Sequence, residues 1–179
     1  MKFEAVVDQA TIDTDRLVLR PLRKSDAGLL SLYAADQRVA EATQTLPHPY
    51  PPGAAEALIS RATAPERTED IWALDGTVAG LSELLGLITL QRMDREQSEV
   101  SYWVAPAFWN TGLASEAVRG LIAANPQKAR TYFACVFQDN PGSARVLTNA
   151  GFDYIGDAEA FSVARGQTVP TWTYLLKLD

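Results

Sequence analysis

Apolar and polar residues alternate along some stretches of the chain and recur every three to four residues along others, which separates predicted strands from predicted helices. Alternating or continuously apolar runs predict strands at 16–20, 70–74, 84–91, 99–104 and 131–137, and then a hairpin that turns at 165–167. Helical spacing predicts one helix that Ser25 and Asp26 can cap, and further helices over 53–64, 113–124 and 141–150. The predicted order is therefore β-α-α-β-β-β-α-β-α-β-β.

The predicted helix at 113–124 lies between two apolar strands, 99–104 and 131–137, and forms a βαβ unit with them. Such a crossover makes the two strands parallel, whereas most other neighbours are expected to be antiparallel. We therefore expect a mixed α/β (α+β) fold in which helices pack on a twisted mixed sheet of about seven strands. At 179 residues, the whole chain (1–179) fits a single domain.

Composition and charge narrow the classes of function. Hydrophobic residues make up 47% of the chain and it has four tryptophans, which favours a packed core over disorder. The formal charge of −6 argues against a partner that presents a phosphate backbone, so we expect no nucleic acid. An acidic surface favours cationic substrates such as amines, although simple solubility explains the same charge.

Cys135 is the only cysteine, which excludes an intramolecular disulfide and a cysteine-based zinc site, and we expect no metal. No long apolar run follows the Met-Lys-Phe-Glu start, so we expect neither a signal peptide nor a membrane span. These features predict a cytoplasmic protein.

One helix start is a candidate for binding a phosphate-bearing ligand. Trp109-Asn-Thr-Gly-Leu-Ala-Ser-Glu116 joins a strand to a helix, and the first turn of a helix offers unpaired N–H groups and the positive end of the dipole. Gly112 removes a Cβ from the approach, and Ala114 and Ser115 are small. The turn can therefore receive a pyrophosphate without a lysine. The alternative is an ordinary helix start with a glycine in a tight turn.

A second helix start follows the next strand. In Asn140-Pro-Gly-Ser143 the asparagine can cap a helix that Gly151 ends, and an ordinary cap is again the alternative. Such a side chain can also turn toward a ligand amide in a neighbouring cleft. Both helix starts face the carboxyl ends of the two parallel strands, where α/β sheets place ligands. The combination favours a binding cleft at this edge.

The motifs, taken in this order, resemble the GNAT superfamily of acetyl-CoA-dependent N-acetyltransferases over residues 12–178. The closest branch is that of the RimJ/RimL-like enzymes, several of which acetylate protein N-termini. The segments that carry the resemblance are Thr14-Asp-Arg-Leu-Val-Leu-Arg20, Leu46-Pro-His-Pro-Tyr50, Glu99-Val-Ser-Tyr-Trp-Val104, Phe108-Trp-Asn-Thr-Gly-Leu-Ala-Ser-Glu-Ala117, Asn140-Pro-Gly-Ser-Ala-Arg-Val-Leu147 and Gly151-Phe152.

The resemblance implies acetyl-CoA as cosubstrate and a sheet that is splayed between the strands at 99–104 and 131–137, with helices on both faces. The pantetheine arm then lies in the gap and takes backbone hydrogen bonds much as an added strand would. By motif, Asn140 bonds to this arm and Ser143 lies near its sulfur. The residues expected to offer main-chain groups to the arm are Trp103, Val104 and Ala105. The residues expected to wrap the pyrophosphate are Thr111, Gly112, Leu113, Ala114 and Ser115.

Two positions depart from the pattern of the branch. Asn110 stands where the branch commonly has glycine, but asparagine tolerates a positive φ better than most residues, so we expect the turn to survive. Thr111 replaces a long polar residue of the pyrophosphate loop. We therefore expect weaker cofactor binding at worst, and not its loss.

Acetyl transfer to an amine needs a neutral nucleophile, an oxyanion stabiliser and a proton for the departing thiolate. Glu99 is the candidate base because it shares a strand face with Ser101 and Trp103, and an ordered water is the alternative. The backbone N–H of Val104 is the candidate oxyanion donor. Many family members use a tyrosine on the helix after the last parallel strand as the acid. Helix 141–150 has none, so Ser143 is the available hydroxyl.

The acceptor site is expected to include His48 and Tyr50 of the proline-rich loop, together with Glu99 and Ser101. His48 is the only histidine, and we favour a binding or structural role for it over catalysis. The acceptor is a primary amine of a protein N-terminus, a polyamine, an aminoglycoside-like drug or an amino acid. Two alternatives are a non-catalytic acyl-CoA-binding regulatory module and a purely structural α/β domain. We expect a monomer or a homodimer, and no partner membrane.

Overall fold

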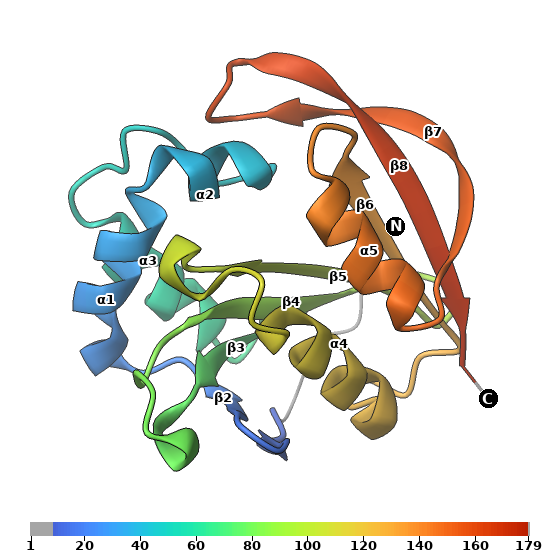
Figure 1. The fold of residues 1–179 in the computed structure, drawn as a ribbon. Coiled ribbons are helices and arrows are strands. Elements are labelled where there is room, and N and C mark those ends of the chain that lie inside the picture. The colour runs from blue at the N-terminus through green and yellow to red at the C-terminus, as the bar shows by residue number, and fades with distance from the viewer. Residues whose placement is uncertain (1–8, 179) are drawn as a thin grey trace.

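One open sheet of eight strands forms the centre of the computed structural model, which describes residues 9–178 (Figure 1). The strands are β1 (Ile12–Asp13), β2 (Val18–Pro21), β3 (Glu69–Asp75), β4 (Gly86–Arg92), β5 (Gln97–Val104), β6 (Thr131–Phe137), β7 (Asp153–Ser162) and β8 (Gln167–Lys177). Their order across the sheet is β1-β2-β3-β4-β5-β6-β8-β7. β5 and β6 are parallel, and all other neighbouring strands described are antiparallel.

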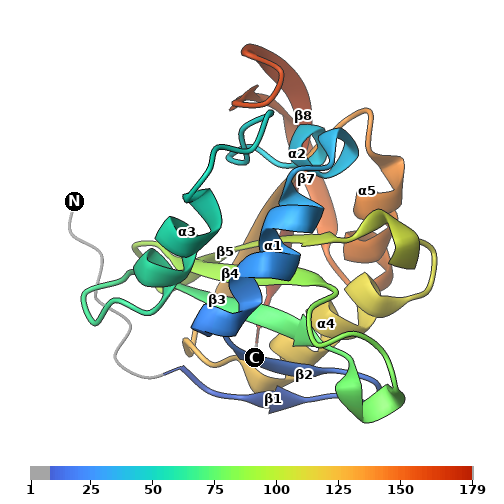
Figure 2. The same cartoon turned by 90° about the vertical axis from the view of Figure 1, so that its left-hand side faces the viewer.

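Helices cover both faces of this sheet (Figure 2). The α-helices in the described range are α1 (Ala27–Ala34), α2 (Gln37–Ala42), α3 (Ala54–Ala62), α4 (Leu113–Ala124) and α5 (Pro141–Asn149). The core on one face is built from the apolar sides of α4 and α5, and the core on the other face from those of α1 and α3. In β4, Ile88 belongs to the first core and Leu87 to the second. Because both faces are covered, β4 appears in the sequence as a continuous apolar run.

The predicted mixed fold is confirmed, including the parallel pairing of β5 with β6. Two elements were missed. β1 has only two residues, which raises the strand number from the expected seven to eight. α2 has only six residues, too few to show a helical period, and it is capped by Asp36, whose carboxylate accepts a hydrogen bond from Arg38 N at 2.9 Å.

Asp26 occupies the N-cap position of α1, as predicted, but its side chain makes no capping hydrogen bond to that helix. Asp26 is fully buried, and its carboxylate accepts hydrogen bonds from the Arg20 guanidinium at 2.8 and 3.0 Å. Arg20 also donates to Asp75 at 2.8 Å. The side chain of Asp26 therefore joins α1 to β2 and β3 through a buried ion pair and does not cap the helix.

The sheet opens between its two parallel strands, as the resemblance implied. The register of β5 and β6 runs from Gln97 opposite Thr131 to Glu99 opposite Phe133, and goes no further. Beyond that point β5 still pairs with β4, as far as Val104 opposite Gly86, and β6 still pairs with β8. The carboxyl-terminal halves of β5 and β6 therefore border a gap.

Between residues 9 and 178 there is no helix long and apolar enough to span a membrane. The Met-Lys-Phe-Glu start, on which the expectation about a signal peptide rested, lies outside the described residues.

Candidate active site

Two cavities meet at the gap between β5 and β6. The larger, of about 500 Å³, is lined by β3, β4 and β5 and by the segment from α2 to α3. The smaller, of about 240 Å³, is lined by the starts of α4 and α5 and by the end of β5. Tyr102, Trp103 and Ser143 line both cavities. A ligand that lies in the gap can therefore reach from one cavity to the other.

The small cavity contains the predicted phosphate-binding turn. Gly112 has a φ of +81° and precedes the first residue of α4, and Asn110 has a φ of +61°. The expectation that Asn110 preserves the turn is therefore confirmed. All five residues from Thr111 to Ser115 line this cavity, at the positive end of the α4 dipole. An anion placed there would meet N–H groups that have no partner within the helix.

Arg16 supports this turn from the amino-terminal segment, a role that sequence reasoning missed. Its guanidinium donates to Glu116 Oε1 at 2.8 Å and to the Thr111 carbonyl oxygen at 3.0 Å. Glu116, in the first turn of α4, also accepts from Thr14 Oγ1 at 2.5 Å. A Cβ added to Gly112 would lie 3.3 Å from Arg16 Nη2. Only the three-dimensional contact reveals this link, because Arg16 and Glu116 are far apart in the sequence.

The end of β5 presents a free backbone edge to the gap. The Ala105 N–H donates to the Leu85 carbonyl oxygen at 2.8 Å, on the β4 side. Because successive backbone groups of a strand point to opposite sides, the N–H and C=O of Val104 point toward β6, which is no longer paired there. The Val104 carbonyl accepts from Trp109 Nε1 at 2.7 Å. The Val104 N–H therefore remains available to a ligand, whereas Ala105 is fully buried and its N–H is engaged.

The start of α5 forms the opposite wall of the gap. Asn140 lines the small cavity and caps the helix, where its carboxamide oxygen accepts from Ser143 N at 3.4 Å. Ser143 Oγ donates to the Tyr102 hydroxyl at 3.0 Å. Sequence reasoning named Asn140 and Ser143 but missed Tyr102, since an alternating strand hides which of its side chains reaches a helix.

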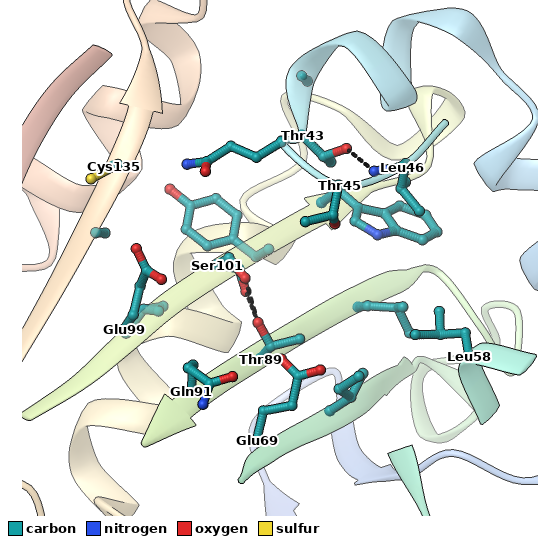
Figure 3. Close-up of a pocket in the computed structure, with 18 of the residues that line it drawn as sticks. Thr43, Thr45, Leu46, Leu58, Glu69, Thr89, Gln91, Glu99, Ser101 and Cys135 are labelled. Atoms are coloured by element: carbon teal, nitrogen blue, oxygen red, sulfur yellow. Dashed lines mark hydrogen bonds between the residues drawn. The ribbon is translucent and has the colours of Figure 1, made fainter. Parts of the chain in front are cut away.

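Polar side chains in register form the floor of the large cavity (Figure 3). Glu69, Gln91 and Glu99 lie opposite one another on β3, β4 and β5, and point from the same face of the sheet. One row nearer to the opening of the gap, the hydroxyls of Thr89 and Ser101 share a hydrogen bond. The predicted acceptor residues Glu99 and Ser101 therefore lie side by side on a polar floor.

The surroundings of the two carboxylates of this floor, Glu69 and Glu99, disfavour their charged forms. Burial raises the pKa of Glu99, and the negative charge of Glu69 raises it further. Burial also raises the pKa of Glu69, although the charge of Arg61 opposes the shift. Ionisable groups with raised pKa values in a cavity are candidates for proton transfer.

The two acceptor residues predicted in the proline-rich loop differ in where they lie. Tyr50 lines the large cavity and is half-buried. His48 is exposed and does not line either cavity, so the structure does not bring it to Glu99. Cys135, the only cysteine of the chain, lies half-buried in the wall of the large cavity. Burial raises the pKa of its thiol, which keeps it in the poorly nucleophilic form.

The tip of the β7–β8 hairpin is tied to the loop after α2, which lines the large cavity. Val163 N donates to the Gln44 carbonyl oxygen at 3.1 Å, which ties the hairpin to the loop after α2. Arg165 donates to the Glu41 carbonyl oxygen at 2.7 Å and pairs with Asp139 at 2.5 Å. The hairpin thus links the acceptor-side loop to the segment just before Asn140.

The protein is similar to known proteins in both sequence and structure. The sequence matches a family model described as an acetyltransferase (GNAT) domain over residues 16–153. The structure is similar to RimL, a ribosomal L7/L12 alpha-N-protein acetyltransferase solved with coenzyme A (TM-score 0.78, 14% identity, 95% of this chain and 99% of that chain covered). It is similar to Mycobacterium smegmatis RimJ in complex with CoA-disulfide (0.78, 20%, 94% and 87%).

A third similar structure is spermidine N-acetyltransferase from Vibrio cholerae in complex with CoA and spermine (0.72, 18%, 89% and 95%). A search of curated protein sequences found no match.

The match to this family model shows that the protein is an acyltransferase. Because the family model matches more than half of the chain, the chain belongs to the GNAT acetyltransferase domain family. The resemblance to the RimJ/RimL-like branch agrees with its structural neighbours.

Proposed function

We propose that this protein transfers the acetyl group of acetyl-CoA directly to a primary amine while both substrates are bound. The observation that carries the proposal is the junction of the two cavities at Tyr102, Trp103 and Ser143, in the gap between β5 and β6. One cavity has an anion-binding helix start and the other has a carboxylate floor. Two substrates of opposite charge can therefore meet at the gap without a covalent enzyme intermediate.

The residues around the small cavity fit the cosubstrate. The turn of Thr111, Gly112 and Ser115 would hold the pyrophosphate, and the free edge of Val104 and the Asn140 carboxamide would hold the pantetheine arm. Acetyl-CoA supplies an activated thioester, so much of the rate can come from holding it beside the amine.

Glu99 is proposed as the general base. It lies one row from Ser101 in the large cavity, and its raised pKa brings the carboxylate closer to the range in which it accepts a proton at working pH. The acceptor arrives as an ammonium ion and must lose a proton before it attacks. Negative charge on Glu69 and Glu99 would attract that ammonium ion into the cavity.

The Val104 N–H is proposed to bind the oxyanion, and Ser143 to protonate the departing thiolate. Both face the gap, one from β5 and the other from α5. Val104 offers a fixed donor in a site where water is partly excluded, which is how a backbone N–H stabilises developing charge.

The similar structures suggest two classes of acceptor, small amines and protein N-termini. One of them was solved with spermine, and another is an acetyltransferase of a ribosomal protein. The volume of the large cavity, about 500 Å³, favours a small acceptor.

The test is coenzyme A release from acetyl-CoA, measured with a thiol reagent, against a panel of polyamines, amino acids, aminoglycosides and amino-terminal peptides. We expect release that depends on one class of amine, with the acetylated amine detected by mass spectrometry. Stabilisation of the fold by acetyl-CoA without amine-dependent release would contradict the proposal and support a non-catalytic acyl-CoA-binding module.

A further inference from the structure

The Tyr102 side chain crosses from β5 to the start of α5, between the two cavities. Its hydroxyl donates to the Ser143 carbonyl oxygen at 2.9 Å, and Ser143 Oγ donates to the same hydroxyl at 3.0 Å. Tyr102 lies on the strand face that carries Val100 and Val104, and its ring packs against the core below α4 and α5. The phenol thus binds both oxygen atoms of the residue proposed as proton donor.

Two acceptors at nearly equal distances allow the phenol to change its hydrogen bond without moving the ring. The O–H of Tyr102 can turn from the Ser143 carbonyl oxygen to Ser143 Oγ, since both lie within hydrogen-bond reach. In the present arrangement the hydrogen of Ser143 Oγ points to Tyr102. After the turn, Tyr102 donates to Ser143, whose own hydrogen becomes free for another acceptor.

Burial keeps this phenol in its neutral, donating form. It raises the pKa of Tyr102 well above its ordinary value, an effect that the hydrogen bond with Ser143 opposes only in part. An aliphatic hydroxyl is a still weaker acid than a phenol. A hydrogen bond from Tyr102 therefore stabilises negative charge that develops on Ser143 Oγ when Ser143 gives up its proton.

We propose that Tyr102 is a positioning residue that turns the Ser143 hydroxyl toward the departing thiolate and stabilises it as it donates. This role rests on the proposed acetyl transfer. The C–S bond of the tetrahedral intermediate breaks, and its electron pair goes to sulfur. The sulfur takes the proton of Ser143 Oγ, the hydrogen bond from Tyr102 stabilises the charge that develops on that oxygen, and Ser143 then regains a proton from solvent water. Of the two protons lost by the acceptor ammonium, one is balanced at sulfur and one goes to solvent.

The phenol beside Ser143 belongs to strand β5 and not to helix α5. The helix carries no tyrosine, so the hydroxyl beside Ser143 comes from the neighbouring strand. The bridge also forms at the junction of the cavities, because both of its residues line both of them. A tyrosine with only a packing role would not need its hydroxyl there.

The test is a double-mutant cycle of Tyr102→Phe and Ser143→Ala, read as the single-turnover rate of coenzyme A release at saturating acetyl-CoA and amine. Phenylalanine keeps the ring and removes the hydroxyl. We expect Ser143→Ala to slow release by about 100-fold and Tyr102→Phe by about 10-fold. Because Tyr102 acts through Ser143, the double variant should be no slower than Ser143→Ala alone.

Tyr132→Phe is the matched control. Tyr132 is a fully buried tyrosine of β6 whose hydroxyl donates to Asn125 Oδ1 at 3.2 Å, at the far end of α4 from the gap. Its loss should lower the midpoint of thermal unfolding and leave the release rate unchanged. The Tyr102→Phe variant should unfold at a temperature no lower than this control.

The outcomes separate this proposal from the function it rests on. No amine-dependent release by the parent protein would refute the proposed function and the role of Tyr102 with it. Release by the parent together with an unchanged rate for Tyr102→Phe, or with rate losses that multiply in the double variant, would overturn the role of Tyr102 alone.

Discussion

The two edges of β5 differ in how far each one is paired with a neighbouring strand. Toward β4, the register is continuous from Ser98 opposite Arg92 to Val104 opposite Gly86. Toward β6, pairing ends at Glu99 opposite Phe133. The closed edge gives the sheet its rigidity, and the open edge leaves backbone groups that a ligand can bind. One strand therefore belongs both to the scaffold and to the site.

The ionisable groups of the scaffold and those of the large cavity also differ in how well they are paired. In the scaffold, burial opposes ionisation of Asp75, yet hydrogen bonds from Arg20 and Thr77 hold its pKa below the ordinary value. In the large cavity, Glu99 and Glu69 have raised pKa values because burial is not offset to the same extent. The paired charges of Arg20 and Asp75 stabilise the fold. The less well paired carboxylates of the cavity, Glu69 and Glu99, are available to a cationic substrate.

Breaking the scaffold side should have the largest effect. Replacing Arg20 in Arg20→Met leaves buried Asp26 without its ion-pair partner and should lower the free energy of unfolding by about 3–5 kcal/mol. Denaturant unfolding of the variant measures this. Arg23→Met is the control, because its ion pair with Glu83 is about half exposed and should contribute at most about 1 kcal/mol. Equal losses in the two variants would contradict the buried network.

On the open side, Glu99→Gln should slow turnover by about 100-fold or more at neutral pH and leave acetyl-CoA affinity unchanged. Steady-state kinetics and a binding titration separate the two. The fold should not suffer. The pKa of Glu99 is raised in the folded protein, so the protein loses stability as the pH rises and this carboxyl ionises. Because glutamine carries no charge, the variant should have a higher unfolding temperature at neutral pH. A parent-like rate across pH would leave ordered water as the base.

The small cavity is tested by Gly112→Asp, which we expect to weaken acetyl-CoA binding by about 100-fold. It places a carboxylate where the pyrophosphate would lie, and a residue with a Cβ where φ is +81°. Gly112→Asn is the control, because asparagine has the same shape, no charge and a tolerance for positive φ. Calorimetric titration should show a much smaller loss for asparagine. Equal affinities in the two variants would remove phosphate binding from this turn.

Glu69→Gln should have the smallest effect, a shift of the pH dependence. The charge of Glu69 helps to raise the pKa of Glu99, so its removal should lower that pKa. Because the base works deprotonated, the acid limb of turnover against pH should move to lower pH. A shift to higher pH, or no shift in a protein that binds amine normally, would show that the two carboxylates do not interact.

Most of the scaffold could be predicted from the sequence, since strands buried on both faces and a helix with a clear apolar period are local signals. The glycine turn before α4, which we propose as the phosphate site, was predictable for the same reason, because Gly112, Ala114 and Ser115 lie together at one helix start. β1 and α2 were too short to give a period.

The missing parts of the site depend on contacts between distant segments. Arg16 reaches the turn before α4, Tyr102 reaches α5, and Glu69 lies two strands from Glu99. Asp26 looked like a helix cap because its buried partner, Arg20, is on another element. No spacing rule along the chain reveals such pairs. His48 was expected to help bind the acceptor because it lies in the proline-rich loop, but it is exposed and lines neither cavity.

The most direct test of the open edge is amide hydrogen exchange of two adjacent residues of the β5 end, with and without acetyl-CoA. The Ala105 N–H is bonded to Leu85 and should exchange slowly in both conditions, whereas the Val104 N–H faces the gap. We expect that saturating acetyl-CoA slows exchange at Val104 by at least about 10-fold more than at Ala105. Equal slowing at both amides, or no change at Val104 while acetyl-CoA binds, would contradict a cosubstrate held in the gap between β5 and β6.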